Sequence, residues 1–464
     1  MRGDRPTRVS TWGALTSDQR HRVLGSLASL ALLFFDQTAV VVALPAIRHE
    51  FGATYNSAEW TVTIYLLALA VFMPVSGRVA ERFGRRRVLL VALVLFGVGS
   101  AASAAAPTMA LLLAARLVQG IGGAVMQPMA LAVGVRGVPA DHRGRVIGLM
   151  STGGSTLLVL GPLIASGLLA VGSWRLLFVV NLPVLVYVIV EMARYGPVTP
   201  PRGTGFPLRS TVWLLLALTA TVLGISQLAT WGPVSVALLV VGVLLLAGFV
   251  RTELTSSDPL LPVAYLRDRV LARSLGALFA IQFAVLATMV SLVAFLEAGV
   301  GVSPAMAGFV VAVTGLGSPL LSVTTGRLAD TLGVRRIVIA GLVAVTAGLL
   351  LTAAAAPTLT ILWLVPGLLL FGISRPAVFT PASSGAMAEI PEEDRPIAAS
   401  LVTEARQLGA VIGVSVVGVL ADFAGRSTPQ EATTGFVASM VATAAVTALA
   451  LAGVLRRMPR RRSV

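Results

Sequence analysis

Two charged side chains lie deep inside apolar stretches of this chain. Each of them needs a polar or charged partner there, or a functional role. Asp36 lies near the middle of the apolar stretch 24–46, and Arg116 lies within the stretch 108–135. A carboxylate at the centre of a membrane span costs about 2.5–3.5 kcal/mol, so we expect Asp36 to face a cavity or a partner. Burial favours the neutral acid, whereas a nearby cation favours the carboxylate. An acid held between these two influences can take up and release a proton.

The depths of Asp36 and Arg116 match. Counted from the same end of the two stretches at 1.5 Å per residue, Asp36 lies about 15 Å and Arg116 about 12 Å into the membrane. A direct or water-bridged ion pair is therefore geometrically possible, and in it Arg116 would hold Asp36 ionised until substrate or a conformational change separates them. The alternatives are a fixed packing pair, or an Asp36 satisfied by hydroxyl groups such as that of Thr38.

A second group of polar residues lies in the last part of the chain. Arg375 and Glu404 also have similar depths, Arg406 is close by, and Gln282 lies in the middle of another apolar stretch. Unpaired charges there would be costly, whereas a hydrogen-bonded cluster is tolerated. We keep Gln282, Arg375 and Glu404 as candidates for binding protons or substrate, but favour a structural or gating cluster for the two charges. If Arg375 instead pointed into a cavity, it would favour anionic or polar substrates.

One turn motif occurs twice, each time between two apolar stretches. In each copy an acid lies four positions after one glycine and three before another, and arginines follow. The residues are Gly77, Glu81, Arg82, Gly84 and Arg85 in the first copy, and Gly326, Asp330, Gly333 and Arg335 in the second. The acids can pair with nearby arginines and with helix N-termini, which attract anions. We therefore predict that both turns act as conformational latches; the alternative is a basic loop that only sets the topology.

The apolar stretches are long enough to cross a membrane. The chain is 56% hydrophobic and 12% charged, with a mean hydropathy of +0.90, which excludes an ordinary soluble protein. About 20 apolar residues span a hydrocarbon core as a helix. We predict about fourteen such helices, at 24–46, 57–78, 86–106, 108–135, 146–170, 174–193, 211–229, 231–250, 274–297, 303–325, 336–355, 357–382, 396–421 and 433–455. Glu297 ends one of these stretches, so we expect it at the membrane interface.

The predicted fold is an all-α polytopic membrane protein with two six-helix bundles and two extra transmembrane helices between them. The repeated turn follows the second helix of each bundle, and such duplication in a membrane chain is typical of transporters. The predicted parts are a tail at 1–23, a bundle at 24–194, a linker at 195–210, the inserted helices at 211–250, a linker at 251–273, a bundle at 274–455 and a basic tail at 456–464.

The positive charge is distributed on one side of the predicted membrane. The net charge is +15 and the chain contains no lysine, so all 35 basic residues are arginine. With the N-terminus in the cytoplasm, only Arg48, Arg175 and Arg426 among the arginines of tails and loops face the opposite side, as the positive-inside rule requires. We predict that both termini are cytoplasmic and that the basic tail contacts anionic lipid and not nucleic acid.

The sequence offers little for catalysis or cofactor chemistry. It contains no cysteine, which excludes disulfides and zinc–thiolate sites. It also lacks a phosphate-binding loop, a metal-binding HExxH motif and a nucleophile elbow in a plausible context. We therefore predict no cofactor, no metal and no enzymatic activity, with an ion gradient and not ATP as the source of energy.

Several motifs resemble the major facilitator superfamily, and specifically its fourteen-helix drug:proton antiporter branch. They are the repeated turn, Asp36-Gln37-Thr38 in the first helix, Arg116-Leu117-Val118-Gln119-Gly120 in the fourth, and Gly148 with Gly161-Pro162 in the fifth. The resemblance implies a secondary active transporter of the plasma membrane that exports small amphipathic organic compounds, including drugs or antibiotics, in exchange for protons, with Asp36 as the coupling acid. We expect it to function as a monomer. A dedicated exporter of one metabolite, and a proton symporter or uniporter for uptake, remain alternatives.

Overall fold

A computed structural model describes residues 15–196, 208–256, 259–261, 263–315, 317–388, 395–425 and 428–456, and the regular structure of these residues is helical. Twelve of the described helices are long and apolar enough to cross a membrane, and shorter apolar helices lie at Leu160–Val171 and Pro304–Val313. The prediction of an all-α membrane protein with about fourteen spanning helices is therefore confirmed. The ends of the predicted tails, most of the first linker and Arg426 lie outside the described residues.

The first half of the chain supplies α1 to α7. Their bounds are α1 Ser17–Phe51, α2 Tyr55–Phe83, α3 Arg85–Ala105, α4 Met109–Gly134, α5 Ala140–Val171, α6 Leu176–Val179 and α7 Asn181–Tyr195. α1 begins within the stretch predicted as a tail because Thr16 and Gln19 form a capping box there. The Gln19 backbone N–H donates to Thr16 Oγ1 at 3.3 Å, and the Thr16 N–H donates to Gln19 Oε1 at 2.9 Å.

The rest of the chain supplies the inserted helices and a second group of helices. The inserted part comprises α8 Leu208–Ser226, α9 Leu228–Trp231, α10 Pro233–Thr255 and the 3-10 helix η1 Val263–Arg267. The second group comprises α11 Arg269–Ala298, α12 Pro304–Val313, α13 Gly317–Leu332, α14 Val334–Ala355, η2 Ala356–Thr358, α15 Ile361–Ala388, α16 Arg395–Ala424 and α17 Pro429–Leu455. The predicted span 303–325 is thus divided between α12 and α13.

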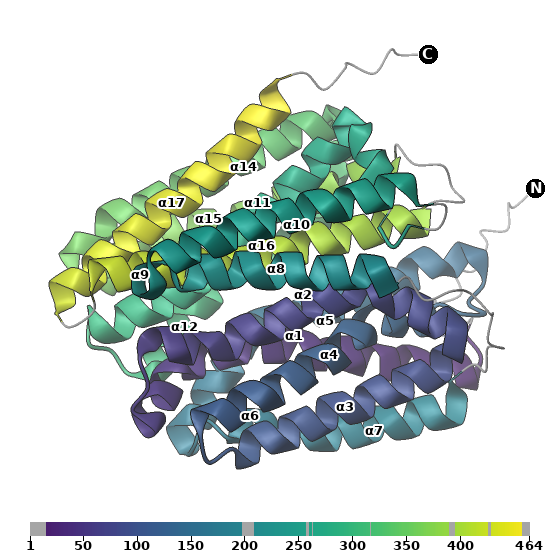
Figure 1. The fold of residues 1–464 in the computed structure, drawn as a ribbon. Coiled ribbons are helices and arrows are strands. Elements are labelled where there is room, and N and C mark those ends of the chain that lie inside the picture. Colours follow the sequence, from purple (N-terminus) through teal and green to yellow (C-terminus); the bar gives the residue numbers. More distant parts are fainter. Residues whose placement is uncertain are drawn as a thin grey trace, which may run out of the picture.

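Figure 1 shows that α1 to α7 gather in one half of the molecule, while α11 and α14 to α17 form the other half. The halves meet where α1 contacts α11, α2 contacts α16 and α5 contacts α12. α8 contacts both α2 and α16, and α10 packs on α8. The two inserted helices therefore lie along the boundary between the halves (Figure 1).

The repeated turn has the same backbone conformation in both halves. Gly84 separates α2 from α3 with φ 89° and ψ 130°, and Gly333 separates α13 from α14 with φ 90° and ψ 138°. A positive φ of this size is accessible to glycine without the steric penalty of a Cβ atom. Both glycines are therefore required by the turn itself, and the repeat seen in the sequence is also a repeat of structure.

Glycines in α4 bring this helix close to its neighbours. A Cβ added to Gly120 would lie 2.8 Å from the carbonyl oxygen of Tyr65 in α2, and one added to Gly122 would lie 2.6 Å from the carbonyl oxygen of Ala92 in α3. Small residues at such contacts let helix backbones approach closely. This approach places the side chains of α4 within reach of both α1 and α2.

Candidate functional site

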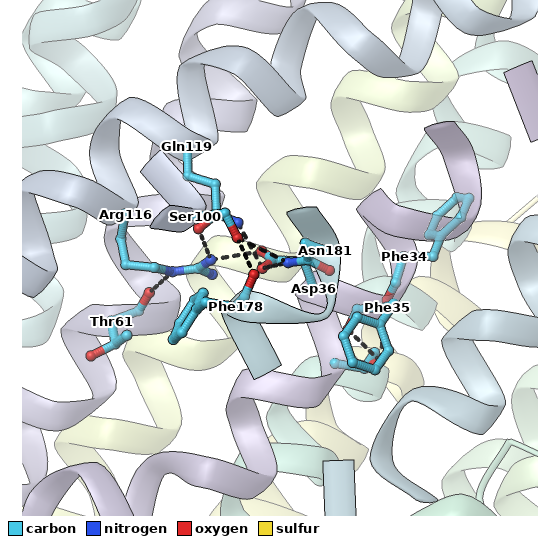
Figure 2. Close-up of polar contacts among 10 residues, drawn as sticks. Phe34, Phe35, Asp36, Thr61, Ser100, Arg116, Gln119, Phe178 and Asn181 are labelled. Atoms are coloured by element: carbon cyan, nitrogen blue, oxygen red, sulfur yellow. Dashed lines mark hydrogen bonds and ion pairs between the residues drawn. The ribbon is translucent and has the colours of Figure 1, made fainter. Parts of the chain in front are cut away.

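Asp36 and Arg116 form an ion pair inside the first half of the molecule (Figure 2). Arg116 Nη1 lies 2.6 Å from Asp36 Oδ2. Asp36 is 1% exposed and Arg116 is 0% exposed, so the pair is removed from solvent. Asp36 lies in α1 and Arg116 lies in α4. The similar depths of the two residues in the sequence therefore correspond to direct contact in the structure.

Two side-chain amides complete the surroundings of the carboxylate. Gln119 Nε2 donates to Asp36 Oδ1 at 2.9 Å, while Gln119 Oε1 accepts a hydrogen bond from Arg116 Nη1 at 2.7 Å. Asn181 Nδ2, at the start of α7, lies 3.5 Å from Asp36 Oδ1 and 3.2 Å from Ser100 Oγ. All of these side chains are buried. Hydrogen bonds donated to a carboxylate favour its charged form, so this arrangement suits an ionised Asp36.

The guanidinium group of Arg116 is also held by α2. Its Nε donates to the carbonyl oxygen of Thr61 at 3.0 Å. Its central carbon lies 4.1 Å from the centroid of the Tyr65 ring and 5.6 Å from that of Phe178. A cation over an aromatic face is attracted by the quadrupole of the ring. The position of Arg116 thus depends on how α1, α2 and α4 pack, and a shift among these helices would change its contact with Asp36.

The residues of the helix-5 motif lie where α5 meets two other helices. Gly161 packs so closely on α1 that an added Cβ would overlap the hydroxyl group of Thr38. On the other side, a Cβ added to Gly308 of α12 would lie 2.8 Å from the carbonyl oxygen of Pro162. α5 therefore connects the helix that carries the acid to the second half of the molecule. Gly148 also lies in α5, in a part whose side chains are outside those described.

A small cavity of about 10 Å³ lies beside Pro162, where α5 meets the second half. Its lining residues come from α5, α11, α15 and the end of α12: Pro162, Val285, Met289, Val311, Thr314, Gly315 and Arg375. Arg375 Nη1 donates to the carbonyl oxygen of Thr314 at 2.8 Å. The structure thus places Arg375 beside a cavity between the halves. For an Arg375 that points into a cavity, the sequence predicts that the protein prefers anionic or polar substrates.

Arg375 and Glu404 do not form the predicted cluster. Neither carboxylate oxygen of Glu404 has a hydrogen-bond partner in the described part of the chain, although the residue is only 5% exposed. Arg375 binds the main chain at Thr314 instead, because α12 ends there and carbonyl groups at a helix end lack helical partners. The prediction of a cluster between these two charges is therefore wrong.

Gln282 forms part of a separate contact between α11 and α16. Its Oε1 accepts a hydrogen bond from Arg406 Nη2 at 3.3 Å. The guanidinium carbon of Arg406 also lies 4.7 Å from the centroid of the Phe379 ring. Gln282 is 5% exposed, so this contact is a buried polar link within the second half.

The sequence of the chain matches known proteins over nearly its whole length. Residues 27–299 and 274–464 match the Major Facilitator Superfamily. The chain belongs to the major facilitator superfamily. It is accordingly a multi-pass membrane transporter and not an enzyme.

Named relatives and solved structures place this major facilitator protein among known transporters. The puromycin resistance protein pur8 of Streptomyces alboniger is 31% identical over 415 residues, 85% of this chain and 80% of the relative. The methyl viologen resistance protein SmvA of Salmonella typhimurium is 30% identical over 83% of this chain and 79% of the relative. The multidrug resistance protein Stp of Mycobacterium tuberculosis is 30% identical over 84% of this chain and 73% of the relative.

Two solved structures share the fold at low sequence identity. The xylose transporter XylE of E. coli, in a partially occluded inward-open conformation, has a TM-score of 0.65 at 15% identity, covering 97% of this chain and 100% of that one. The human organic anion transporter MFSD10 has a TM-score of 0.64 at 16% identity, covering 94% and 99%. At such identities the likeness shows the major facilitator fold alone.

The repeated turns contain fewer ion pairs than the sequence predicts. Glu81 Oε2 lies 3.9 Å from Arg78 Nη1, within the same helix. Asp330 is exposed and forms no ion pair with the described residues, so the pairing predicted for it is wrong. An exposed carboxylate gains little from an ion pair because water already solvates it. Arg335, which follows the second turn, donates to the carbonyl oxygen of Leu455 at 2.8 Å and so ties α14 to the end of α17.

Sequence reasoning missed three members of the network around Asp36. Gln119 lies three residues after Arg116 and thus on the same face of α4, a spacing that could have identified it. Asn181 and Ser100 are polar residues inside apolar stretches, but such residues often bond to their own helix. Only the packing of α7 against α1 and α3 shows that Asn181 reaches both Asp36 and Ser100.

Proposed function

We propose that this transporter exports small amphipathic organic compounds, drugs or antibiotics among them, across the plasma membrane in exchange for protons. The observation that carries the proposal is the buried pair of Asp36 and Arg116, an acid whose partner is held by several helices. Relatives named for resistance to puromycin, methyl viologen and multiple drugs support export, because a transporter gives resistance by removing the compound.

The contacts around the acid suggest how a proton is coupled to movement. An ionised Asp36 attracts Arg116 and orients Gln119, which bonds to both charges. Protonation of Asp36 removes the charge that holds the guanidinium group, so α4 loses an attachment to α1. Because α5 packs on α1 at Gly161 and on α12 at Pro162, a shift of α1 is transmitted to the second half. Proton binding and release on opposite sides then favour opposite arrangements of the halves.

The proton gradient is large enough to drive such a cycle. One proton that moves through 100 mV releases about 2.3 kcal/mol. Each unit of pH difference adds about 1.4 kcal/mol. Together these release about 3.7 kcal/mol, which supports a substrate gradient of between two and three orders of magnitude for each net proton.

The same proposal assigns the orientation in the membrane. The beginnings of α1 and α3 carry arginines, and so does the beginning of α14 after the second turn. Arg335 at the start of α14 contacts the end of α17, so that the end of α17 lies on this arginine-rich side. Under the positive-inside rule, this arrangement supports cytoplasmic termini. One chain supplies both halves and the contacts between them, which supports a functional monomer.

Export of one anionic metabolite is the second candidate. Arg375 beside the cavity between the halves favours it, because a buried guanidinium attracts carboxylate or phosphate groups. Methyl viologen, a permanent dication, would then be a poor substrate. Comparing it with organic anions of similar size separates this candidate from multidrug export.

The decisive experiment is transport into proteoliposomes with an acidic interior. An antiporter will accumulate external methyl viologen as protons leave, whereas a proton symporter will not. Methyl viologen is suitable because its fixed charge prevents passive trapping as a weak base. Asp36→Asn is expected to reduce accumulation to the level of protein-free liposomes.

Asp18→Asn is the matched control, since Asp18 is an exposed acid in the first turn of the same helix. It is expected to retain transport. Accumulation that persists in the Asp36→Asn protein would show that another group couples protons, and Glu404 would be the next to test. Accumulation driven only by an alkaline interior would favour uptake by symport.

A further inference from the structure

The inserted helices are hydrogen-bonded to both ends of α2. At the beginning of α2, Asn56 Nδ2 donates to the carbonyl oxygen of Ser226 at 2.7 Å, and Gln227 Nε2 donates to Asn56 Oδ1 at 3.2 Å. Ser226 ends α8, and Gln227 lies between α8 and α9. Near the other end of α2, Arg78 Nη2 donates to the carbonyl oxygen of Pro259, in the segment after α10, at 3.1 Å. The inserted helices are therefore attached to the first half at both ends of α2.

The beginning of α2 also bonds to the second half. Asn56 Nδ2 donates to Asp422 Oδ2, near the end of α16, at 2.9 Å. The neighbouring Tyr55 donates through its hydroxyl group to the carbonyl oxygen of Val290 in α11 at 3.3 Å. Because α2 ends at a repeated turn, its beginning lies on the opposite side of the membrane, here called the far side. The first two residues of α2 thus join the halves on the far side.

The loop between α8 and α9 orients the amide group of Asn56. Such a group offers two N–H donors and an acceptor oxygen. One donor is used by the carbonyl group of Ser226, which lies at the end of α8, and the oxygen is used by Gln227. Gln227 is itself held by Thr230, whose hydroxyl group donates to Gln227 Oε1 at 2.7 Å. The second donor of Asn56 is therefore directed to Asp422.

These contacts lie beside a cavity between the halves on the far side. The cavity has a volume of about 220 Å³, and Tyr55 and Ser291 are among its lining residues. If the halves separate on the far side, α2 moves away from α16 and the bond from Asn56 to Asp422 breaks. This bond is partly buried and ends on a carboxylate, and charge-assisted hydrogen bonds are stronger than neutral ones. It therefore favours the closed arrangement.

We propose that the inserted helices act as an arm of the first half that keeps the far side closed. The loop residues Ser226 and Gln227 are positioning residues for Asn56. Asn56 binds Asp422 while the far side is closed and releases it when the halves separate there. The proposal rests on two alternating arrangements of the halves, as the proposed function does, but not on the coupling acid or on the compound transported.

The absence of cysteine from the chain allows the opening to be measured with one introduced thiol. Ser291→Cys places it in the cavity wall, at a residue that is 5% exposed. The rate of alkylation by a bulky maleimide is measured on purified protein in nanodiscs, without substrate or gradient. Adding Asn56→Ala is expected to raise the rate about tenfold, which corresponds to about 1.4 kcal/mol in favour of the open arrangement. Adding Asp422→Asn, which keeps the shape of the side chain, is expected to raise it severalfold.

Gln227 tests the positioning role. Gln227→Ala is expected to raise the alkylation rate severalfold in the protein that retains Asn56, because the amide group is no longer fixed toward Asp422. Combined with Asn56→Ala, it is expected to have no further effect, since residues that act through one contact are not additive. A full additional increase in the combined variant would show that Gln227 does not act through Asn56, and the positioning role would be wrong.

Two controls separate opening of the far side from a general loosening of the protein. Ser57→Ala changes a residue next to Asn56 whose hydroxyl group bonds to that of Thr54, and it is expected to leave the rate unchanged. Ser103→Cys, used in place of Ser291→Cys, puts the thiol at a residue of 0% exposure near the far-side end of α3. Its alkylation is expected to be the same with and without Asn56→Ala.

Two results would overturn the proposal. One is an unchanged alkylation rate of the Ser291→Cys thiol with both Asn56→Ala and Asp422→Asn. The other is an equal increase at the Ser291→Cys and Ser103→Cys thiols, which would mean that the substitution only loosens the fold. Either result would leave the transport test on Asp36 unaffected, since no gradient is involved.

Discussion

Two of the buried acids, Asp36 in the first half of this transporter and Glu404 in the second, have opposite surroundings. Asp36 has hydrogen-bond donors on both carboxylate oxygens, whereas Glu404 has none on either oxygen in the described chain. Both residues are at most 5% exposed. A buried charge is tolerated when it is paired and hydrogen-bonded. The surroundings of Asp36 therefore suit a charged acid, whereas no hydrogen bond from the described residues stabilises a charge on Glu404.

The two acids differ in their surroundings, although the arginines of the two halves make equivalent contacts. In the fourth helix of each group, an arginine donates to a main-chain carbonyl of the second helix: Arg116 to Thr61, and Arg375 to Thr314. The first helix of the second half, α11, carries Gln282 in its interior and its acid, Glu297, near its end. Duplication thus preserved the arginine and its helix contact, while the acid lies next to the arginine in only one half.

Substitution of the arginine in each half is expected to give the largest difference in unfolding free energy between the two halves. Arg116→Gln leaves Asp36 buried without its cation, which costs about 3–5 kcal/mol of unfolding free energy. Arg375→Gln removes a hydrogen bond to a carbonyl group and leaves no acid unpaired, so we expect a loss of about 1–3 kcal/mol. Denaturation of both purified variants in mixed micelles measures the difference. Equal losses would mean that Arg116 acts mainly through Thr61 and the aromatic rings.

The glutamines of the two halves provide the next comparison. Gln119→Ala removes a donor to Asp36 and an acceptor for Arg116, and is expected to cost about 1–3 kcal/mol. Gln282→Ala removes a single contact of 3.3 Å to Arg406, so its cost is expected to be smaller. The same denaturation measurement applies. A larger loss for Gln282→Ala would show that the polar contacts of the second half are stronger than their geometry indicates.

The sequence predicts the elements of the fold better than the contacts between them. Apolar length identifies the helices, and the spacing of two glycines identifies the repeated turn, because both depend on short segments. Matching depths made a pair of Asp36 and Arg116 possible, and the structure shows their direct contact. Depth also suggested a contact between Arg375 and Glu404, and there it failed, because the break between α12 and α13 offers Arg375 a free carbonyl group. Asn181 reaches the acid only through the packing of three helices.

Equivalent substitutions in the two repeated turns are expected to lower the unfolding free energy by equal amounts. Gly84→Ala and Gly333→Ala each force a Cβ atom into a positive φ, which costs roughly 1–2 kcal/mol. Gly77→Ala is the matched control within the first turn motif. It lies inside α2 with no atom within 4 Å of an added Cβ, so it is expected to stabilise the helix by about 0.5–1 kcal/mol. Unequal losses at Gly84 and Gly333 would argue against equivalent turns.

Substitution of Glu404 is expected to have the smallest effect on stability. Glu404→Gln keeps the shape of the side chain and removes the possibility of a charge, and no hydrogen bond of the described structure is lost with it. We therefore expect the unfolding free energy to change by less than about 1 kcal/mol or to rise. Asp36→Asn, the same chemical change in the first half, loses charge-assisted hydrogen bonds from Arg116 and Gln119 and is expected to cost about 1–3 kcal/mol. A large loss for Glu404→Gln would mean that Glu404 is charged and paired in the folded protein, and the contrast between the two halves would then be wrong.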